Sequence, residues 1–305
     1  MNHTPKTKVR PGIHILWLLS LAAFILLVYC GEALSAAAYD SLLFAAKKLV
    51  PSMFLFAVAT GLVSALPAPT GHGRLPLLKL PTSAAIALAI GLFSGFPMGA
   101  YAAKRLWDRG VLPQKTAEHL AAFANNASFG FLYFTVGALL GDTKWGVLLF
   151  LSGTLASLFV GILFMPNENA RPDTPSLSEP PSLFTLISDA IVSAANAMLT
   201  LCGYLALFGA LAKALSLIAL PPSLFTAAIL FFEPTAAVRH LATLDLTAAL
   251  PLIAFALGFS GFSILLQSLS VWQGQLRFLR VCLLRLTIGL LSALLTSLFV
   301  FLSAL

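Results

Sequence analysis

The chain has 305 residues, of which 59% are hydrophobic and only 10% are charged, and its mean hydropathy is +0.95. An ordinary soluble domain carries about 25% charged residues, so this composition excludes a soluble globular protein. The formal net charge of +7 does not indicate nucleic-acid binding, because the basic residues stand in short clusters between apolar segments. The composition therefore indicates an integral membrane protein in contact with a lipid bilayer.

Apolar segments long enough to cross a bilayer recur along the chain. A spanning helix needs about 20 predominantly apolar residues. The segments are continuously apolar rather than alternating, which favours helices over the strands of a barrel. They are Ile13–Cys30, Leu49–Leu66, Trp145–Met165, Leu183–Leu215 and Val281–Leu305. The sequence therefore predicts an all-α, polytopic membrane protein.

The N-terminal segment predicts an uncleaved first helix. Lys6, Lys8 and Arg10 precede it, so the positive-inside bias places the N-terminus in the cytoplasm. The small residues 36–38 resemble a signal-peptidase site, but the apolar core exceeds the roughly 7–15 residues of a signal peptide. We expect Glu32–Lys48 to form a partly amphipathic stretch on the outer side, after which Leu49–Leu66 returns inward.

A break interrupts the next apolar segment, AIGLFSGFPMGAYAAKRLWDRG (Ala89–Gly110). The apolar part, Thr82–Phe93, spans about 18 Å as a helix and reaches only the middle of a bilayer. A re-entrant helical hairpin that turns at residues 94–97 returns Lys104 and Arg105 to the cytoplasm, as the positive-inside bias favours. A proline-kinked spanning helix is the alternative, since such kinks are tolerated in membranes.

A second break lies within AEHLAAFANNASFGFLYFTVGALLG (Ala117–Gly141), where Asn125 and Asn126 stand between apolar stretches. Carboxamides at this depth need partners in protein, water or ligand. The pattern predicts a discontinuous helix, with both side chains facing the hairpin of Pro97 rather than lipid. The alternative is that the two asparagines only join helices.

The same order of elements follows a second time. A long helix, Leu183–Leu215, precedes a short one that breaks at Glu233-Pro234; another breaks at Gly258–Ser263, and a last span ends the chain. The two halves start on opposite sides, and inverted repeats with discontinuous helices are typical of secondary transporters. We therefore divide the chain into an N-terminal helix with its amphipathic segment (1–48), a first repeat (49–165), a Pro-rich linker (166–182) and a second repeat (183–305).

Four motifs in this order resemble a known family. They are GLFSGFPMGAYAAKRL, LAAFANNASFGFLYFTVG, the glutamate-containing break and GFSGFSILLQSLS. The order is similar to the YlbJ family of sporulation integral membrane proteins, within the nucleoside-recognition or Gate-domain group, over nearly the whole chain from about Leu49. The resemblance implies a membrane protein of spore-forming bacteria that is required for sporulation. It implies no known substrate.

The helix breaks supply the candidate binding residues, because interrupted helices expose unpaired N–H and carbonyl groups. Hydroxyls, carboxamides and one carboxylate at the breaks would suit a small polar solute, either nucleoside-like or an ion. The residues are Ser94, Gly95, Pro97, Asn125, Asn126, Ser128, Glu233, Pro234, Ser260, Gly261, Ser263 and Gln267. For the serines, packing against neighbouring helices is the alternative interpretation.

Glu233 is the candidate functional carboxylate, because it follows the apolar run Leu224–Phe232 and precedes a proline. We assign Arg277, Arg280 and Arg285 to a basic turn before the last span, and we expect no basic side chain at the depth of Glu233, since Arg239 lies toward the outer mouth. The carboxyl group should then be protonated or paired with a coupling cation, either a proton or sodium. Capping of a helix N-terminus is the alternative.

These features predict a transporter-like protein rather than an enzyme. The sequence has no catalytic motif such as HExxH, GxSxG or a phosphate-binding loop, and we expect no catalytic residues, metal site or cofactor. Cys30, Cys202 and Cys282 lie far apart in apolar segments and are expected to be core residues. A non-transporting scaffold or signalling protein is the alternative function. The sequence is compatible with a homo-oligomer but does not determine one.

Overall fold

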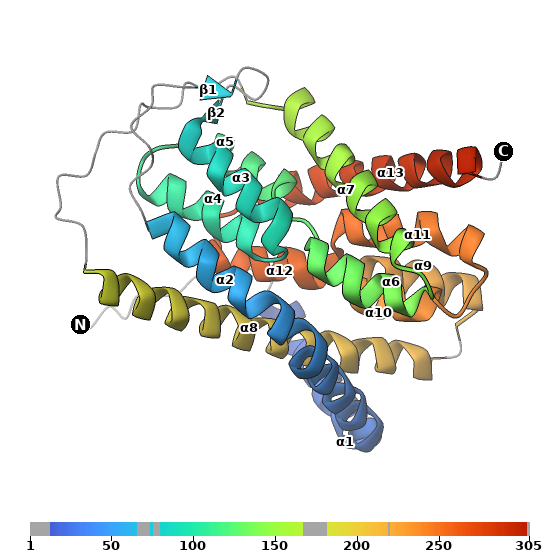
Figure 1. Ribbon diagram of the computed structural model, residues 1–305. Helices are drawn as coiled ribbons and strands as arrows, with labels where there is room; N and C mark the ends of the chain where they lie inside the picture. The colour runs from blue at the N-terminus through green and yellow to red at the C-terminus, as the bar shows by residue number, and fades with distance from the viewer. Residues whose placement is uncertain (1–12, 66–73, 76–79, 167–181, 219, 304–305) are drawn as a thin grey trace, which may run out of the picture.

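The computed structural model describes residues 13–65, 74–75, 80–166, 182–218 and 220–303 (Figure 1). The regular elements in these ranges are helices, apart from one antiparallel pair of two-residue strands. The elements are α1 (Ile13–Phe44), the π-helical turn η1 (Ala45–Leu49), α2 (Val50–Ala65), β1 (Arg74–Leu75), β2 (Leu80–Pro81), α3 (Thr82–Ser94), α4 (Met98–Asp108), α5 (Gln114–Phe123), the π-helical η2 (Phe131–Val136), α6 (Gly137–Leu139), α7 (Thr143–Leu163), α8 (Leu183–Leu217), α9 (Pro222–Phe232), α10 (Pro234–Leu241), α11 (Leu246–Phe259), α12 (Gly261–Val271) and α13 (Phe278–Ser303). The predicted N-terminal basic cluster and most of the predicted linker lie outside the described residues.

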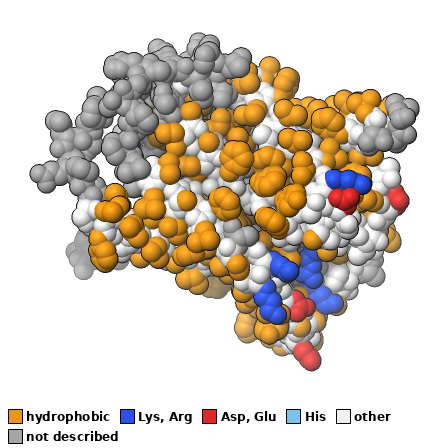
Figure 2. Space-filling model, viewed as in Figure 1, with side chains coloured by type: hydrophobic (Ala, Val, Ile, Leu, Met, Phe, Trp, Pro, Cys, Tyr) orange, Lys and Arg blue, Asp and Glu red, His pale blue; other side chains and the backbone are white. Residues whose placement is uncertain are grey.

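Five helical stretches in the described ranges are long and apolar enough to cross a membrane. They are Ser20–Leu49, Thr143–Leu163, Leu183–Leu217, Leu246–Val271 and Phe278–Leu302. Large apolar side chains such as Leu55, Phe134 and Leu294 are exposed on the outside, and Figure 2 shows apolar side chains over most of the visible surface. Such extensive exposed apolar surface fits lipid contact, so the predicted all-α membrane protein is confirmed at this level.

The N-terminal region differs from the sequence prediction, because no loop separates the first two apolar segments. Helix α1 is kinked at Cys30, runs on to Phe44 and passes through η1 directly into α2. The widened turn lies just before Pro51, whose ring would clash with the carbonyl four residues earlier in a regular helix. The expected separate amphipathic stretch is therefore part of one helical path.

The chain reverses direction at the first predicted break. Helix α3 ends at Ser94, Gly95 adopts a φ of +85°, and α4 begins at Met98. A Cβ atom on Gly91 would lie only 2.9 Å from the Cα atom of Gly99. Eight residues of a continuous helix would separate these positions by about 12 Å. Helices α3 and α4 therefore form a helical hairpin rather than one kinked helix.

A second helical hairpin forms where Glu233 and Pro234 separate α9 from α10. Thr226 Oγ1 and His240 Nε2 are 3.0 Å apart, although 14 residues of a continuous helix would extend about 21 Å. Pro234 is the first residue of α10, where the missing N–H of proline leaves no intrahelical bond unmade. The predicted break at this position is confirmed.

Two further helices are discontinuous, as the sequence predicts. The chain leaves helical geometry at residues 125–128 after α5 and becomes helical again before η2. Between α11 and α12, Ser260 and Gly261 have φ values of +76° and +67°. This left-handed conformation is natural for glycine but unfavourable for serine, so surrounding contacts must hold Ser260 in place.

The long helices surround these broken elements. Helix α8 packs against α1 and α2, and α13 packs against α11 and α7 (Figure 1). The hairpins α3–α4 and α9–α10 lie toward opposite ends of the molecule in this view. Close contact between α11 and α13 depends on Gly258 and Gly289, since a Cβ atom on Gly258 would lie 2.7 Å from the Gly289 Cα atom.

The approach of the first hairpin to the break after α5 predicts that Gly91→Ala destabilises the protein. The added Cβ atom would lie 2.1 Å from the carbonyl oxygen of Ala124, and such overpacking costs about 1–3 kcal/mol. The melting temperature of detergent-purified protein should therefore fall. Gly203→Ala is the matched control, because its Cβ atom would meet open space within α8. Equal melting temperatures for the two variants would contradict the packing of this hairpin.

Candidate functional site

The four helix breaks lie against one another in pairs. In the first half, a Cβ atom on Gly95 would be 2.8 Å from the Cβ atom of Ser128, which places the hairpin tip against the break after α5. In the second half, a Cβ atom on Gly261 would be 2.9 Å from the Phe232 carbonyl oxygen and from Pro234 Cδ. Each hairpin tip thus contacts the discontinuous helix of its own half.

Arg285 of α13 connects the two pairs. Its side chain is buried, with 2% of the residue surface exposed. Nη1 donates to the carbonyl oxygen of Ala122 at 3.1 Å and to Asn126 Oδ1 at 3.0 Å. Nη2 donates to the carbonyl oxygen of Leu257 at 3.2 Å and to the Ser260 hydroxyl. One guanidinium group therefore holds both discontinuous helices at their breaks.

The two carbonyl groups that Arg285 contacts belong to helix C-termini. Ala122 lies in the last turn of α5 and Leu257 in the last turn of α11. Carbonyl groups there have no intrahelical partner and carry the negative end of the helix dipole. The Cζ atom of Arg285 also lies 5.8 Å from the centre of the Phe96 ring at the first hairpin tip, within the range of a cation–π contact.

The position of Arg285 corrects the sequence analysis. The residue is not in a basic turn, because α13 begins seven residues earlier, at Phe278. A basic side chain is therefore present among the helix breaks, contrary to the expectation that none lies there. The available signal was one arginine between apolar residues of a spanning segment, which by itself marks a functional or structural site.

The two asparagines are buried, as predicted, and their carboxamides form hydrogen bonds with several other helices. Asn126 Oδ1 accepts a second hydrogen bond from Ser157 of α7 at 2.8 Å, and its Nδ2 donates to the carbonyl oxygen of Phe123. Asn125 Nδ2 donates to Ser268 of α12 at 3.1 Å. These bonds to α5, α7, α12 and α13 match the alternative that the asparagines join helices, and the expectation that their side chains face the hairpin stays a prediction.

Several buried polar atoms near the breaks have no hydrogen-bond partner. They are Asn125 Oδ1, Ser263 Oγ, both polar atoms of the Gln267 carboxamide and Arg285 Nε. Ser263 and Gln267 are one helical turn apart on α12, so they share a face, and Asn125 bonds the residue after Gln267. An unbonded buried amide costs about 2–7 kcal/mol depending on the reference state, so these atoms require water or a ligand.

Glu233 is buried and acts as the N-cap of α10. Its two carboxylate oxygens accept the backbone N–H groups of Thr235 at 2.9 Å and Ala236 at 2.5 Å. These are donors that a helix N-terminus leaves unpaired, and the dipole there favours a negative charge. The structure therefore matches the alternative that Glu233 caps a helix N-terminus. The backbone N–H groups bond both carboxylate oxygens, so these oxygens have partners even when no ion is bound.

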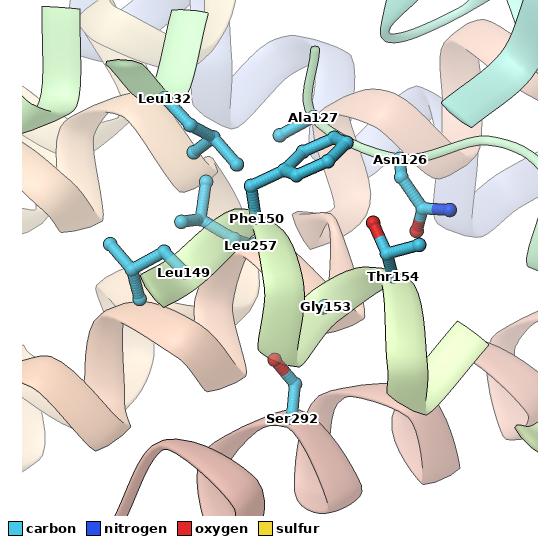
Figure 3. Close-up of a pocket in the computed structure, with 10 residues that line it drawn as sticks. Asn126, Ala127, Leu132, Leu149, Phe150, Gly153, Thr154, Leu257 and Ser292 are labelled. Carbon is cyan, nitrogen blue, oxygen red and sulfur yellow. The ribbon is translucent and has the colours of Figure 1, made fainter. Parts of the chain in front are cut away.

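Three of the predicted residues, Ser128, Glu233 and Pro234, line one pocket. Its wall includes Phe96 of the first hairpin, Ser128 of the break after α5, Glu233 and Pro234 of the second hairpin, and Ile264 of α12. The cavity volume is about 30 Å³, room for roughly one or two water molecules. A second small pocket adjoins Asn126 and Thr154 beside α7, as Figure 3 shows.

The remaining predicted residues have structural partners. Ser94 Oγ lies 2.8 Å from Thr60 Oγ1 of α2, and Ser128 Oγ accepts the N–H of Phe131 at 3.1 Å. These contacts match the packing alternative for the serines. Gly95 and Pro97 form the first hairpin turn, and Pro97 immediately precedes α4.

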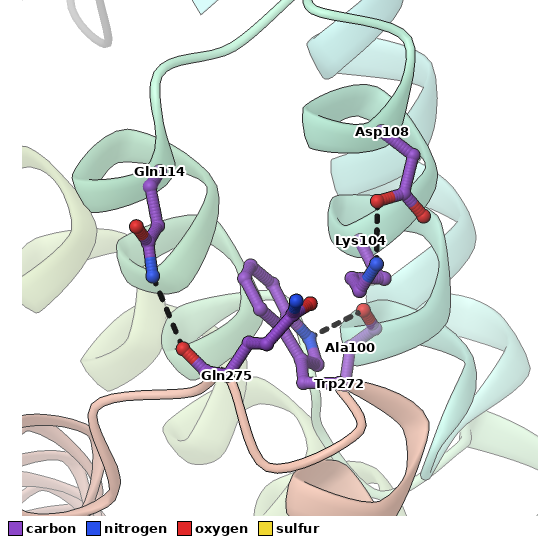
Figure 4. Close-up of polar contacts among 6 residues, drawn as sticks. All are labelled: Ala100, Lys104, Asp108, Gln114, Trp272 and Gln275. Atoms are coloured by element: carbon purple, nitrogen blue, oxygen red, sulfur yellow. Dashed lines mark hydrogen bonds and ion pairs between the residues drawn. The ribbon is translucent and has the colours of Figure 1, made fainter.

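Away from the breaks, side chains of the first hairpin and of α5 contact the end of α12 and the turn that follows it (Figure 4). Trp272 Nε1 donates to the carbonyl oxygen of Ala100 at 3.1 Å, and the Trp272 ring stacks on Trp107 with centroids 5.3 Å apart. Gln114 Nε2 donates to the carbonyl oxygen of Gln275 at 3.1 Å. Sequence reasoning did not find these contacts, because they join residues more than 160 positions apart.

Comparison with known proteins identifies one relevant similarity. The chain is 25% identical over 261 residues to the sporulation integral membrane protein YlbJ of Bacillus subtilis (strain 168). The match covers 72% of this chain, which spans about 64% of the length of that protein. No family model and no solved structure matches the chain. The similarity, together with the apolar helices, supports an integral membrane protein.

The bonds of Asn126 predict that Asn126→Ala strongly destabilises the protein. Loss of the carboxamide removes an acceptor from both Ser157 and Arg285, and each buried donor left unpaired costs about 1–3 kcal/mol. The melting temperature should fall well below that of Asn196→Ala, a control on the exposed face of α8. If the two variants have the same melting temperature, the hydrogen bonds of Asn126 with Ser157 and Arg285 do not stabilise the fold.

Proposed function

We propose that the protein is a transporter-like, multi-pass membrane protein that binds a small polar solute, nucleoside-like or an ion, at the helix breaks. The observation that carries the proposal is the group of unpartnered buried atoms of Asn125, Ser263 and Gln267. Both donors and acceptors are present in this group, so a solute with hydroxyl, amide or similar groups could satisfy them. Such atoms are expensive in a protein that uses them only for packing.

The arrangement of the broken helices supports this interpretation. A helical hairpin followed by a discontinuous helix occurs twice in the same order. We infer two inverted repeats, in which both hairpins are re-entrant and the N-terminus is cytoplasmic. In secondary transporters of this architecture the substrate lies near the midplane, where the interrupted helices of the two repeats meet.

The biological setting that we propose is sporulation. The similar protein from Bacillus subtilis is named for sporulation, and membership of this chain in the same nucleoside-recognition or Gate-domain group is part of the proposal. A non-transporting scaffold or signalling protein of sporulation is the second candidate. The bonded state of Ser94, Ser128 and Asn126 favours it, since these residues are fully engaged in holding the fold.

Two measurements separate the candidate functions. Thermal-shift screening of purified protein over nucleosides, other small metabolites and ions should identify a stabilising solute. Vesicles containing the protein should then accumulate that solute, whereas empty vesicles should not. Complementation of a Bacillus subtilis strain that lacks YlbJ, with neither binding nor uptake, would instead support the scaffold.

The inverted topology predicts where introduced cysteines react with a membrane-impermeant reagent. A cysteine beside Asp108, at the end of α4, should be labelled from the cytoplasmic side. A cysteine beside Asp245, which precedes α11, should be labelled from outside. Labelling of the Asp108 position from outside alone would contradict the proposed cytoplasmic, re-entrant orientation of the first hairpin.

Glu233 lies beside the pocket, so we expect its charge to be needed for coupling by a proton or sodium ion. Glu233→Asn retains a good capping residue and removes the charge, and Glu233→Gln keeps the length of the side chain. Both variants should fold and lose uptake and complementation. Asp189→Asn, on the exposed face of α8, is the control and should retain both. Full activity of Glu233→Asn would restrict Glu233 to its capping role.

A further inference from the structure

We propose that Arg285 is a tethered cation, which permanently occupies the position where two helix C-termini would otherwise hold an exchangeable ion. In transporters with discontinuous helices, half-helix C-termini and unwound carbonyl groups coordinate the coupling cation. Here the corresponding ends belong to α5 and α11, and the Arg285 guanidinium contacts both. The inference does not depend on the solute proposed above, because it concerns what holds the ends of α5 and α11 together.

The contacts of Arg285 have the composition of a cation site. Four oxygen atoms receive its N–H groups: two backbone carbonyls, one carboxamide oxygen and one hydroxyl. Neutral oxygens of these kinds are also typical ligands of hard metal cations. Two of these oxygen atoms belong to the last turn of α5 and the break after it. The other two belong to the last turn of α11 and the break after it. A group that bonds all four must therefore bridge the two halves of the chain.

The charge of the guanidinium is balanced by dipoles rather than by a carboxylate. The four hydrogen-bond partners of Arg285 are uncharged, and none of the ion pairs among the described residues includes it. Glu233, the buried acid of the second hairpin, directs its oxygens to the N-terminus of α10 instead. Glu233 and Arg285 thus each lie at a helix end whose dipole favours the ionised form of that side chain.

Arginine suits this position better than lysine. Its planar guanidinium presents several N–H groups in a fixed fork, so Nη1 can serve α5 while Nη2 serves α11. An ammonium group is a compact point charge and cannot span the two helix ends in the same way. The left-handed conformation of Ser260 is consistent with this role, because its hydroxyl is one of the four acceptors.

The first test compares Arg285→Lys with Arg285→Gln, since both side chains are polar and only lysine keeps the charge. The melting temperatures of the purified proteins should decrease in the order wild type, lysine, glutamine. We expect the glutamine variant to melt more than about 5 °C below wild type, given the strength of buried charged hydrogen bonds. A glutamine variant as stable as the lysine variant would overturn the proposal, because charge would then be irrelevant.

The second test restores the cation to a shortened side chain. Millimolar methylguanidinium should raise the melting temperature of Arg285→Ala saturably, and should leave wild type and the control Arg280→Ala unchanged. Arg280 is the matched control because it lies on α13 and is only partly buried. No rise in Arg285→Ala, or an equal rise in the control, would count against a cation site. If Arg285→Ala does not fold, the lysine and glutamine comparison decides alone.

Discussion

The guanidinium of Arg285 is the contact on which the rest of the interior depends. It bonds the last turns of α5 and α11 together with the side chains of Asn126 and Ser260. Interrupting a helix inside a membrane leaves carbonyl groups that neither water nor lipid can satisfy. A cationic side chain from a third helix meets this requirement for both interrupted helices at once. The cost of burying its charge is offset by dipoles that are already oriented toward it.

The same electrostatic rule applies to the opposite charge. Glu233 is placed at the N-terminus of α10, where its oxygens accept N–H groups that the helix leaves unpaired. Glu233 and Arg285 therefore do not pair with each other, and each is bonded at a helix end instead. Some buried polar atoms, above all those of the Gln267 carboxamide, have no hydrogen-bond partner within the protein.

Small residues allow the broken helices to approach closely enough for these contacts. Gly91 and Gly99 bring the first hairpin against the carbonyl group of Ala124, and Gly258 faces Gly289 between α11 and α13. The pocket beside Glu233 has a volume of about 30 Å³, so admission of a solute larger than water requires movement of the surrounding helices. The Trp107–Trp272 stack and the bond to Ala100 hold the first hairpin to α12 in the present conformation.

The sequence by itself determined the class of protein, the four breaks and most of the long helices, although the predicted span Leu49–Leu66 is not among the helices long enough to cross a membrane. These features are local, since apolar length sets a spanning helix, and Gly, Pro or Asn in an apolar run interrupts one. Asn125, Asn126 and Glu233 were also correctly placed in the interior. The partners of these residues depended on the tertiary structure, because Arg285 bonds Asn126 across 159 positions and the helix ends could not be oriented from sequence alone. Pairing between distant segments is set by three-dimensional packing, which a pattern of neighbouring residues does not contain.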